Sequence, residues 1–302
     1  MSGSLQIATA PERGYTLYGD LRGREAAGLA SVLVAKGLRV EFVEETPSLA
    51  LALAARGGRD SGPYLRTPEG FVLAESHAIL EWIEVTHPEP ALVPLSPVRR
   101  TVARVLEDWV ELWLPNWPRR SWNTLERIGA HLEAAGFLMG RVPIRADWLL
   151  AAWLETEVLT HAHAREHLSR HAPRLISLGE DLLGVGDRES REIVAGDDAL
   201  PISLLGILEE LGADYHQYLV LNHHALKDRE DEVSIDLGLG KAPLPVQEAC
   251  ELRRIENGRE LALLDRKARR RVAEALEPMR AWHALTLPPA IEALDPGDPR
   301  SL

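Results

Sequence analysis

The order of short strands and helices near the N-terminus is the feature that most constrains how this chain can fold. Residues 15–19 and 40–43 carry β-favouring side chains, and between them Leu29 and Val32 belong to an apolar set with helical spacing. Residues 46–56 begin with Thr-Pro, a usual helix start. The sequence therefore predicts a strand, a helix, a second strand and a second helix in succession.

A β-hairpin and a third helix follow. Two short strands, predicted at 64–66 and 71–73, flank the turn Thr67-Pro68-Glu69-Gly70. Ser76 is expected to cap a helix that ends before Pro88. The complete order, strand–helix–strand–helix–strand–strand–helix, is that of a thioredoxin-like α/β domain, which we place at residues 12–88.

The rest of the chain is predicted to be mostly helical. A proline-rich linker, "HPEPALVPLSP", separates the first domain from an all-helical domain at 98–184 and a helical extension at 185–302. One short strand is expected at 233–236. The predicted helices are 98–115, 121–136, 144–159, 161–170, 173–184, 201–226, 244–262 and 266–281.

Composition narrows the classes of function. The 34 basic and 46 acidic residues give a net charge of −12, which disfavours nucleic acid and anionic membrane surfaces as partners. No run of 18 apolar residues is present, so no membrane span is expected. The single cysteine, Cys250, excludes an internal disulfide and fits a reducing compartment. We expect a cytoplasmic protein.

Four segments make the chain resemble the glutathione S-transferase superfamily over roughly residues 15–184. "LYGDLRGREAAGLASVLVAKGL" is similar to the opening strand, turn and first helix of that family, and "GPYLRTPEGFVLAESHAILEWIE" to its glutathione cradle. "FLMGRVPIRADWLLAAWL" is similar to the start of a central helix, and "HAPRLISLGEDLL" to a later one. The segment beyond residue 190 resembles the helical extension of some bacterial members.

The resemblance implies a glutathione site at two places. Gly62-Pro63 matches an X-Pro bond held cis, so that the main chain of Gly62 can pair with the cysteinyl amide of glutathione. Where the family usually has a branched residue, Gly62 is expected to loosen the site. Glu75 and Ser76 match the helix start that binds the γ-glutamyl end, where Ser76 and backbone N–H groups hold the carboxylate and Glu75 the ammonium. The alternatives are an ordinary edge-strand proline and a plain helix cap.

The residue that usually activates the thiol in this family is missing. The family's serine or cysteine positions are occupied by Gly23 and Ala26, and Tyr18 lies within the first strand. A thiolate could instead be stabilised by the start of the first helix and by Arg22 or Arg24. The alternative is that both arginines are solvated turn residues.

A second substrate would lie between the domains, as ligand pockets often do. Trp109 and Trp113 are one helical turn apart within "WVELWLPNWPRRSW", a segment that also holds Trp117 and Trp122. They could form an aromatic wall for an apolar small molecule. The alternative is a role in the core or in a subunit contact.

These observations lead to one favoured function and two rivals. The favoured function is glutathione binding with conjugation of glutathione to an apolar electrophile, although the sequence leaves enzymatic activity undecided. The first rival is a non-catalytic scaffold or regulatory member, which the empty positions Gly23 and Ala26 favour. The second is a glutathione-dependent isomerase or reductase. The resemblance also implies a homodimer, and no metal cofactor is expected.

Overall fold

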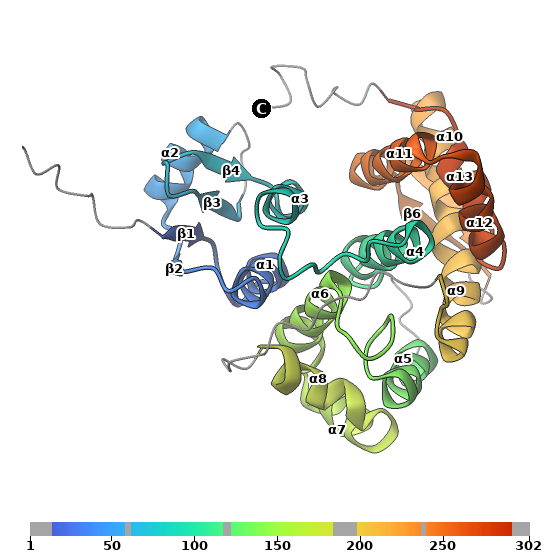
Figure 1. The fold of residues 1–302 in the computed structure, drawn as a ribbon, viewed down its shortest axis with the longest axis horizontal. Helices are drawn as coiled ribbons and strands as arrows, with labels where there is room; N and C mark the ends of the chain where they lie inside the picture. The colour runs from blue at the N-terminus through green and yellow to red at the C-terminus, as the bar shows by residue number, and fades with distance from the viewer. Residues whose placement is uncertain (1–13, 58–61, 117–121, 184–197, 237–239, 292–302) are drawn as a thin grey trace, which may run out of the picture. The chain divides into compact units, whose positions relative to one another are not determined.

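The computed structural model describes residues 14–57, 62–116, 122–183, 198–236 and 240–291 (Figure 1). The chain divides into two compact units, residues 1–90 and 91–302. The predicted domain boundaries at residue 12 and at 184–185 lie outside the described residues.

The first unit contains a four-stranded sheet with the order β2-β1-β3-β4. β1 (Tyr15–Tyr18) pairs in parallel with β2 (Val40–Val43) and antiparallel with β3 (Tyr64–Arg66), which in turn pairs antiparallel with β4 (Val72–Ala74). The strand–helix–strand order makes β1 and β2 parallel, because the connecting helix returns the chain to the same end of the sheet. The predicted thioredoxin-like fold of this part is confirmed.

Three helices complete the first unit: α1 (Arg24–Ala35), α2 (Pro47–Gly57) and α3 (Ser76–Thr86). α1 and α3 pack against each other, and α2 packs against β4. Leu29 and Val32, predicted from their helical spacing, are buried in α1, and Ile79 and Ile83 are buried in α3. They form the core together with residues of β1 and β3: Leu17, Leu29, Leu33, Leu65, Ile79 and Ile83.

A buried lysine joins the ends of α1 and α3. The Lys36 side chain is fully buried, and its Nζ lies 2.8 Å from Glu84 Oε2 and donates to the carbonyl oxygen of His87 at 2.8 Å. The Tyr15 hydroxyl lies 2.7 Å from Nε2 of His87, which ties β1 to the same point. This buried cation is thus paired, as the cost of burying a charge requires.

The first part of the second unit is helical, as predicted. Two of its helices, α4 and α6, continue into π-helical turns, η1 and η2. The elements are α4 (Pro97–Asp108), η1 (Trp109–Trp113), α5 (Trp122–Ala135), α6 (Arg145–Trp153), η2 (Leu154–Val158), α7 (Ala162–His171) and α8 (Pro173–Leu183).

The C-terminal part departs from the predicted helical extension. A two-stranded antiparallel sheet interrupts it, so the helix predicted to begin at residue 244 begins at 248. The helix predicted at 266–281 ends at residue 276. The elements are η3 (Ile202–Leu204), α9 (Leu205–Leu211), η4 (Gly212–His216), α10 (Gln217–Asp228), β5 (Glu232–Asp236), β6 (Lys241–Pro245), α11 (Glu248–Leu263), α12 (Arg266–Leu276) and α13 (Ala281–Thr286).

Asp147 caps the start of α6 from inside the helix. Its carboxylate accepts hydrogen bonds from the backbone N–H groups of Leu138 and Ile144, both at 2.8 Å. Complete burial raises the pKa of Asp147 to about 7, against the opposing effect of these hydrogen bonds. Ile144, at the cap position, has no side-chain oxygen, and the carboxylate of Asp147 accepts the backbone N–H of Ile144 in place of a capping side chain.

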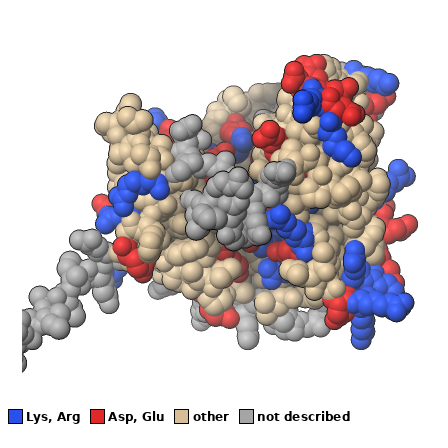
Figure 2. All heavy atoms as spheres, turned by 90° about the horizontal axis from the view of Figure 1, so that it is seen from above, with Lys and Arg blue, Asp and Glu red and all other residues tan. Residues whose placement is uncertain are grey.

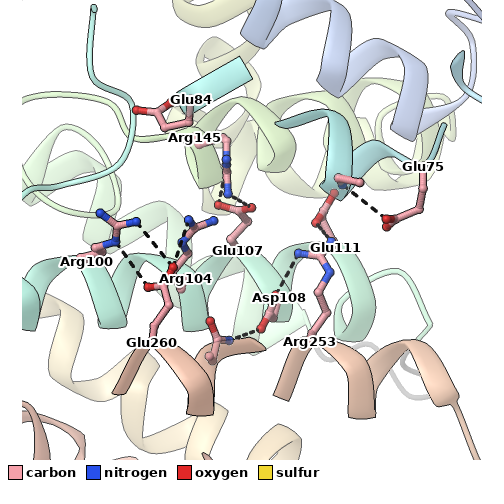
Figure 3. A network of polar contacts seen from close by, with 12 residues as sticks. Glu75, Glu84, Arg100, Arg104, Glu107, Asp108, Glu111, Arg145, Arg253 and Glu260 are labelled. Carbon is pink, nitrogen blue, oxygen red and sulfur yellow. Dashed lines mark hydrogen bonds and ion pairs between the residues drawn. The ribbon is translucent and has the colours of Figure 1, made fainter. Parts of the chain in front are cut away.

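Ion pairs connect α4 to α6 and α11 inside the second unit (Figure 3). Glu107 receives two hydrogen bonds from the buried Arg145 of α6, at 2.6 and 2.8 Å. Arg253 of α11 lies 3.2 Å from Asp108 and 2.6 Å from Glu111. Because α11 belongs to the C-terminal part, these contacts make it integral to the second unit.

Charges of both signs occur on the face of the molecule drawn in Figure 2, where basic side chains have acidic side chains beside them. Among the described residues, no helix has the length and apolar character needed to cross a bilayer.

Candidate functional site

The predicted glutathione-binding residues lie at one edge of the first unit's sheet, where β1 and β4 end and β3 begins. A Cβ atom placed on Gly19, directly after β1, would lie 3.1 Å from Cβ of Ala26 and 3.3 Å from Cβ of Pro63. The first turn of α1 and the start of β3 are therefore in close contact at Gly19. Glycine is needed there because any side chain would crowd both neighbours.

The peptide bond between Gly62 and Pro63 is cis, as the resemblance implies. The space beside Gly62 is filled, however. A Cβ atom on Gly62 would lie 2.9 Å from Oε2 of Glu45 and 3.0 Å from the ring of Tyr64, which is fully buried. The expectation that Gly62 loosens the site is thus wrong, because an aromatic ring and a carboxylate occupy the position of the missing side chain.

Glu75 and Ser76 form a sharp corner between β4 and α3. In the β3–β4 register Tyr64 is paired with Ala74, so Glu75 and Ser76 follow next to the start of β3. Glu75 has a φ of 73°, which is strained for a residue with a side chain. It is also the helix cap, since its carboxylate accepts the N–H of Ala78 at 3.3 Å. The expectation that Ser76 caps this helix is therefore wrong, because Ser76 is its first residue.

The Ser76 hydroxyl is a buried polar group without a hydrogen-bond partner among the described residues. The residue is 8% exposed and stands in the first turn of α3, where the helix dipole favours negative charge. Leaving a buried hydroxyl unpaired costs about 1–3 kcal/mol. This arrangement suits a ligand whose anionic group accepts the hydroxyl hydrogen.

The start of α1 offers backbone donors but no reactive side chain. Gly23 occupies the cap position and makes no side-chain hydrogen bond to the helix, while Ala26 is buried against Gly19 and Pro63. Tyr18, the last residue of β1, is half-buried. The positions at which the family carries its serine or cysteine thus hold no hydroxyl or thiol here.

The two arginines next to this helix start have different surroundings. The Arg22 side chain is 80% exposed and binds Asp20 at 2.8 Å and Glu44 at 3.4 Å. Its hydrogen bonds lower the pKa of Asp20. Arg24 is the first residue of α1 and is half-buried. Of the two, Arg24 is the arginine that belongs to the helix start itself.

The tryptophans proposed as an aromatic wall are core residues of the second unit. Trp109 is 2% and Trp113 4% exposed. The Trp113 ring packs against Tyr215 and Tyr218, with centroid distances of 5.7 and 5.1 Å. These contacts favour the core interpretation over the ligand wall. Trp117 lies outside the described residues.

Sequence reasoning missed Glu45, Tyr64 and Gly19 at this edge. Glu45 follows β2, and the parallel pairing of β2 with β1 brings the carboxyl ends of both strands to the same side. That pairing was predictable, so the "EE" after the second strand could have pointed to an acidic group here. The approach of Tyr64 to Gly62 depends on packing and left no local signal.

The fold and this edge define the first unit as a thioredoxin-like domain with an X-Pro bond beside a helix start. Residues 17–91 match the model of the glutathione S-transferase N-terminal domain. For this domain the match confirms the predicted resemblance to the glutathione S-transferase superfamily. No curated protein sequence matches the chain.

Solved structures of glutathione S-transferases are similar to part of the chain. A glutathione S-transferase of Methylobacterium radiotolerans, in complex with glutathione sulfonate, is 24% identical; the match covers 62% of this chain and 98% of that one, with a TM-score of 0.44. A Tau class glutathione S-transferase of mango (Mangifera indica) is 16% identical; the match covers 62% of this chain and 95% of that one, with a TM-score of 0.48. A maleylacetoacetate isomerase of Methylobacterium extorquens with bound malonate and glutathione is 21% identical. The match covers 56% of this chain and 92% of that one, with a TM-score of 0.43.

Proposed function

We propose that the first unit binds glutathione at the sheet edge formed by Gly62, Pro63, Glu75 and Ser76. The observation that carries this proposal is the buried, unpartnered hydroxyl of Ser76 in the first turn of α3. It offers a hydrogen bond to the γ-glutamyl carboxylate where the helix dipole also favours an anion. The main chain at Gly62 pairs with the cysteinyl residue, which directs the thiol towards the start of α1.

In the catalytic form of this proposal, α1 stabilises the thiolate. The backbone N–H groups of the first turn and the guanidinium of Arg24 lower the thiol pKa, since positive charge favours the ionised form. The thiolate sulfur then attacks an electrophilic carbon of an apolar substrate and forms a thioether. The bond broken is either that to a leaving group, which departs with its electron pair, or the π bond of an activated alkene, whose neighbouring carbon then takes up a proton. Arg22 contributes less, because Asp20 and Glu44 already neutralise its charge.

The rival proposal is a non-catalytic scaffold or regulatory protein that keeps the fold but has lost the thiol chemistry. The absence of a hydroxyl or thiol at Gly23 and Ala26 supports it. Isomerisation or reduction with glutathione as cofactor would use the same binding site, and the fold does not distinguish these reactions. A cytoplasmic homodimer remains part of the proposal on the family resemblance.

Replacing Ser76 by alanine tests the binding site. We expect millimolar glutathione to raise the thermal unfolding midpoint of the wild type, and Ser76→Ala to weaken binding about tenfold or more, as the loss of a hydrogen bond to a charged group does. Without ligand, the variant should be as stable as the wild type or more stable, because it lacks a buried unpaired hydroxyl. Thermal shift and titration calorimetry measure both effects.

Ser48→Ala is the matched control, since Ser48 is an exposed serine of α2 that contacts Thr46. It should leave glutathione binding unchanged. If glutathione stabilises neither the wild type nor the variants, the binding proposal is wrong. Equal binding by wild type and Ser76→Ala would remove Ser76 from the site.

The thiol pKa of bound glutathione separates the catalytic from the non-catalytic form. We expect Arg24→Ala to raise this pKa by about one unit or more, because an opposite charge close to a thiolate typically lowers its pKa by that amount. Arg22→Ala should change it less, since Arg22 is exposed and paired. The thiolate absorbance, followed against pH with saturating protein, measures the shift. An identical titration curve in wild type and Arg24→Ala would contradict activation by arginine.

A further inference from the structure

A carboxylate lies beside the main chain that the proposed ligand would pair with. Glu45 follows β2, is half-buried, and places Oε2 2.9 Å from the point where a Cβ atom on Gly62 would stand. The preceding residue, Glu44, accepts a hydrogen bond from Arg22 at 3.4 Å. The sheet edge next to Gly62 is therefore acidic on the β2 side.

The sheet order fixes which end of the ligand meets Glu45. Along the edge, Ser76 follows β4, Gly62 precedes β3, and Glu45 follows β2, and the strands lie in the order β4, β3, β1, β2. A ligand with its γ-glutamyl end at Ser76 and its cysteinyl residue at Gly62 continues towards Glu45. One further extended residue spans about 3.3 Å, so the third residue of the peptide lies close to this carboxylate.

Glutathione has a glycyl carboxylate at that third position. Two carboxylates a few ångströms apart repel each other, and the half-buried position of Glu45 reduces screening by water. Arg22, in the turn after β1, is bound to Asp20 and Glu44. The acidic residues alone do not define a ligand site, but the unpartnered Ser76 hydroxyl at the other end of the same edge independently points to a ligand.

We propose that Glu45 makes this site select γ-glutamylcysteinyl thiols whose C-terminal end is neutral or cationic, such as amine-linked amides, over glutathione itself. This inference rests on the proposed binding of a γ-glutamylcysteinyl peptide at Gly62 and Ser76. Glu45 acts as a specificity-determining residue, because it attracts an ammonium group and repels a carboxylate at the same point. The thiol and γ-glutamyl contacts are common to all such ligands.

Three ligands that differ only at the C-terminal end test the proposal on the full chain. They are glutathione, its glycyl monoethyl ester, which lacks the terminal charge, and an amide of glutathione with a diamine, which carries an ammonium group. Titration calorimetry gives their affinities for the wild type, for Glu45→Gln and for the control Glu41→Gln. Glu41 is an exposed acidic residue of β2. Thermal unfolding of each variant verifies that its fold is intact.

We expect the wild type to bind the ester about fivefold more tightly than glutathione, and the diamine amide more tightly still, as charge interactions at partly exposed sites allow. Glu45→Gln should strengthen glutathione binding and abolish the difference among the three ligands. Glu41→Gln should keep the wild-type order. Added salt should reduce the differences in affinity among the three ligands for the wild type, because it screens the charges.

The possible failures are distinguishable. If the wild type binds all three ligands equally, or prefers glutathione, the role of Glu45 is refuted while the proposed binding function stands. The same conclusion follows if Glu45→Gln and Glu41→Gln have the same effect. If none of the three ligands binds the wild type or Glu45→Gln, both the inference and the proposed function are refuted.

Discussion

Gly212→Ala will destabilise the second unit by about 3 kcal/mol or more, as severe overpacking against a rigid neighbour does. Gly212 opens the π-helical turn η4, and a Cβ atom there would lie 2.2 Å from the carbonyl oxygen and 2.7 Å from the Cα of Met279. Because these are backbone atoms, no side chain can move aside to make room. The turn between α12 and α13 would have to separate from η4.

Denaturant unfolding followed by tryptophan fluorescence measures this loss, since seven of the eight tryptophans lie beyond residue 90. Gly206→Ala in α9 is the matched control, because outside its own helix Arg127 Cδ, at 4.0 Å, is the only described atom within 4 Å of the new Cβ. Alanine is the better helix former, so the control should be up to about 1 kcal/mol more stable. Wild-type stability in Gly212→Ala would show that η4 and Met279 are not packed this closely.

Arg254→Met is the second change with a large expected effect. The buried guanidinium donates two hydrogen bonds to Glu251, both at 2.7 Å, and further ones to the carbonyl oxygens of Ala284, Leu287 and Pro288. Glu251 is fully buried. Removing one partner of a buried ion pair costs about 3–5 kcal/mol, because the other charge stays buried. Unfolding of the variant in denaturant measures the loss.

The pH dependence of the stability lost in Arg254→Met identifies the cause of that loss. Burial alone would raise the pKa of Glu251, but its hydrogen bonds with Arg254 and Ala290 and the charge of Arg254 hold it below its ordinary value. In Arg254→Met the pKa of the folded state rises, so the folded protein binds a proton more readily than the unfolded chain. The deficit relative to wild type should therefore be larger at pH 8 than at pH 5. Arg270→Met, at an exposed arginine of α12, is the control and should change stability little.

A deficit independent of pH would contradict the assignment to an uncompensated Glu251 charge. So would an equal loss in Arg254→Met and Arg270→Met. A pH-independent deficit confined to Arg254→Met would assign the loss to packing around the arginine stem.

The first unit could be predicted from sequence because its signals are local. Turn residues separate short elements, and β2 and β3 occupy the predicted residues. The second strand of the β5–β6 sheet was missed, because Pro243 and Pro245 lack the backbone donor expected of a strand. Ala242 and Leu244 are nonetheless buried on one face, as the alternation of a strand requires.

Contacts between distant segments set the limit of prediction elsewhere. The helix expected at 201–226 is divided by η4, where Gly212 lies against Met279, 67 residues later in the chain. Helical periodicity carries no information on such an approach. The candidate site shows the same limit, since the Gly62-Pro63 and Glu75-Ser76 pairs were visible as local patterns, whereas the filled space at Gly62 depends on Glu45 and Tyr64.

The hydrogen bonds of Arg254 also define how far the second unit extends. Its acceptors lie at residues 284–288, and Glu251 accepts the backbone N–H of Ala290. The described residues that follow α13 have little regular structure. They nevertheless complete the hydrogen bonding of the buried Arg254–Glu251 ion pair. A fragment designed to isolate the second unit must therefore retain the chain through Ala290. A shorter fragment would leave Arg254 and Glu251 without some of their hydrogen-bond partners.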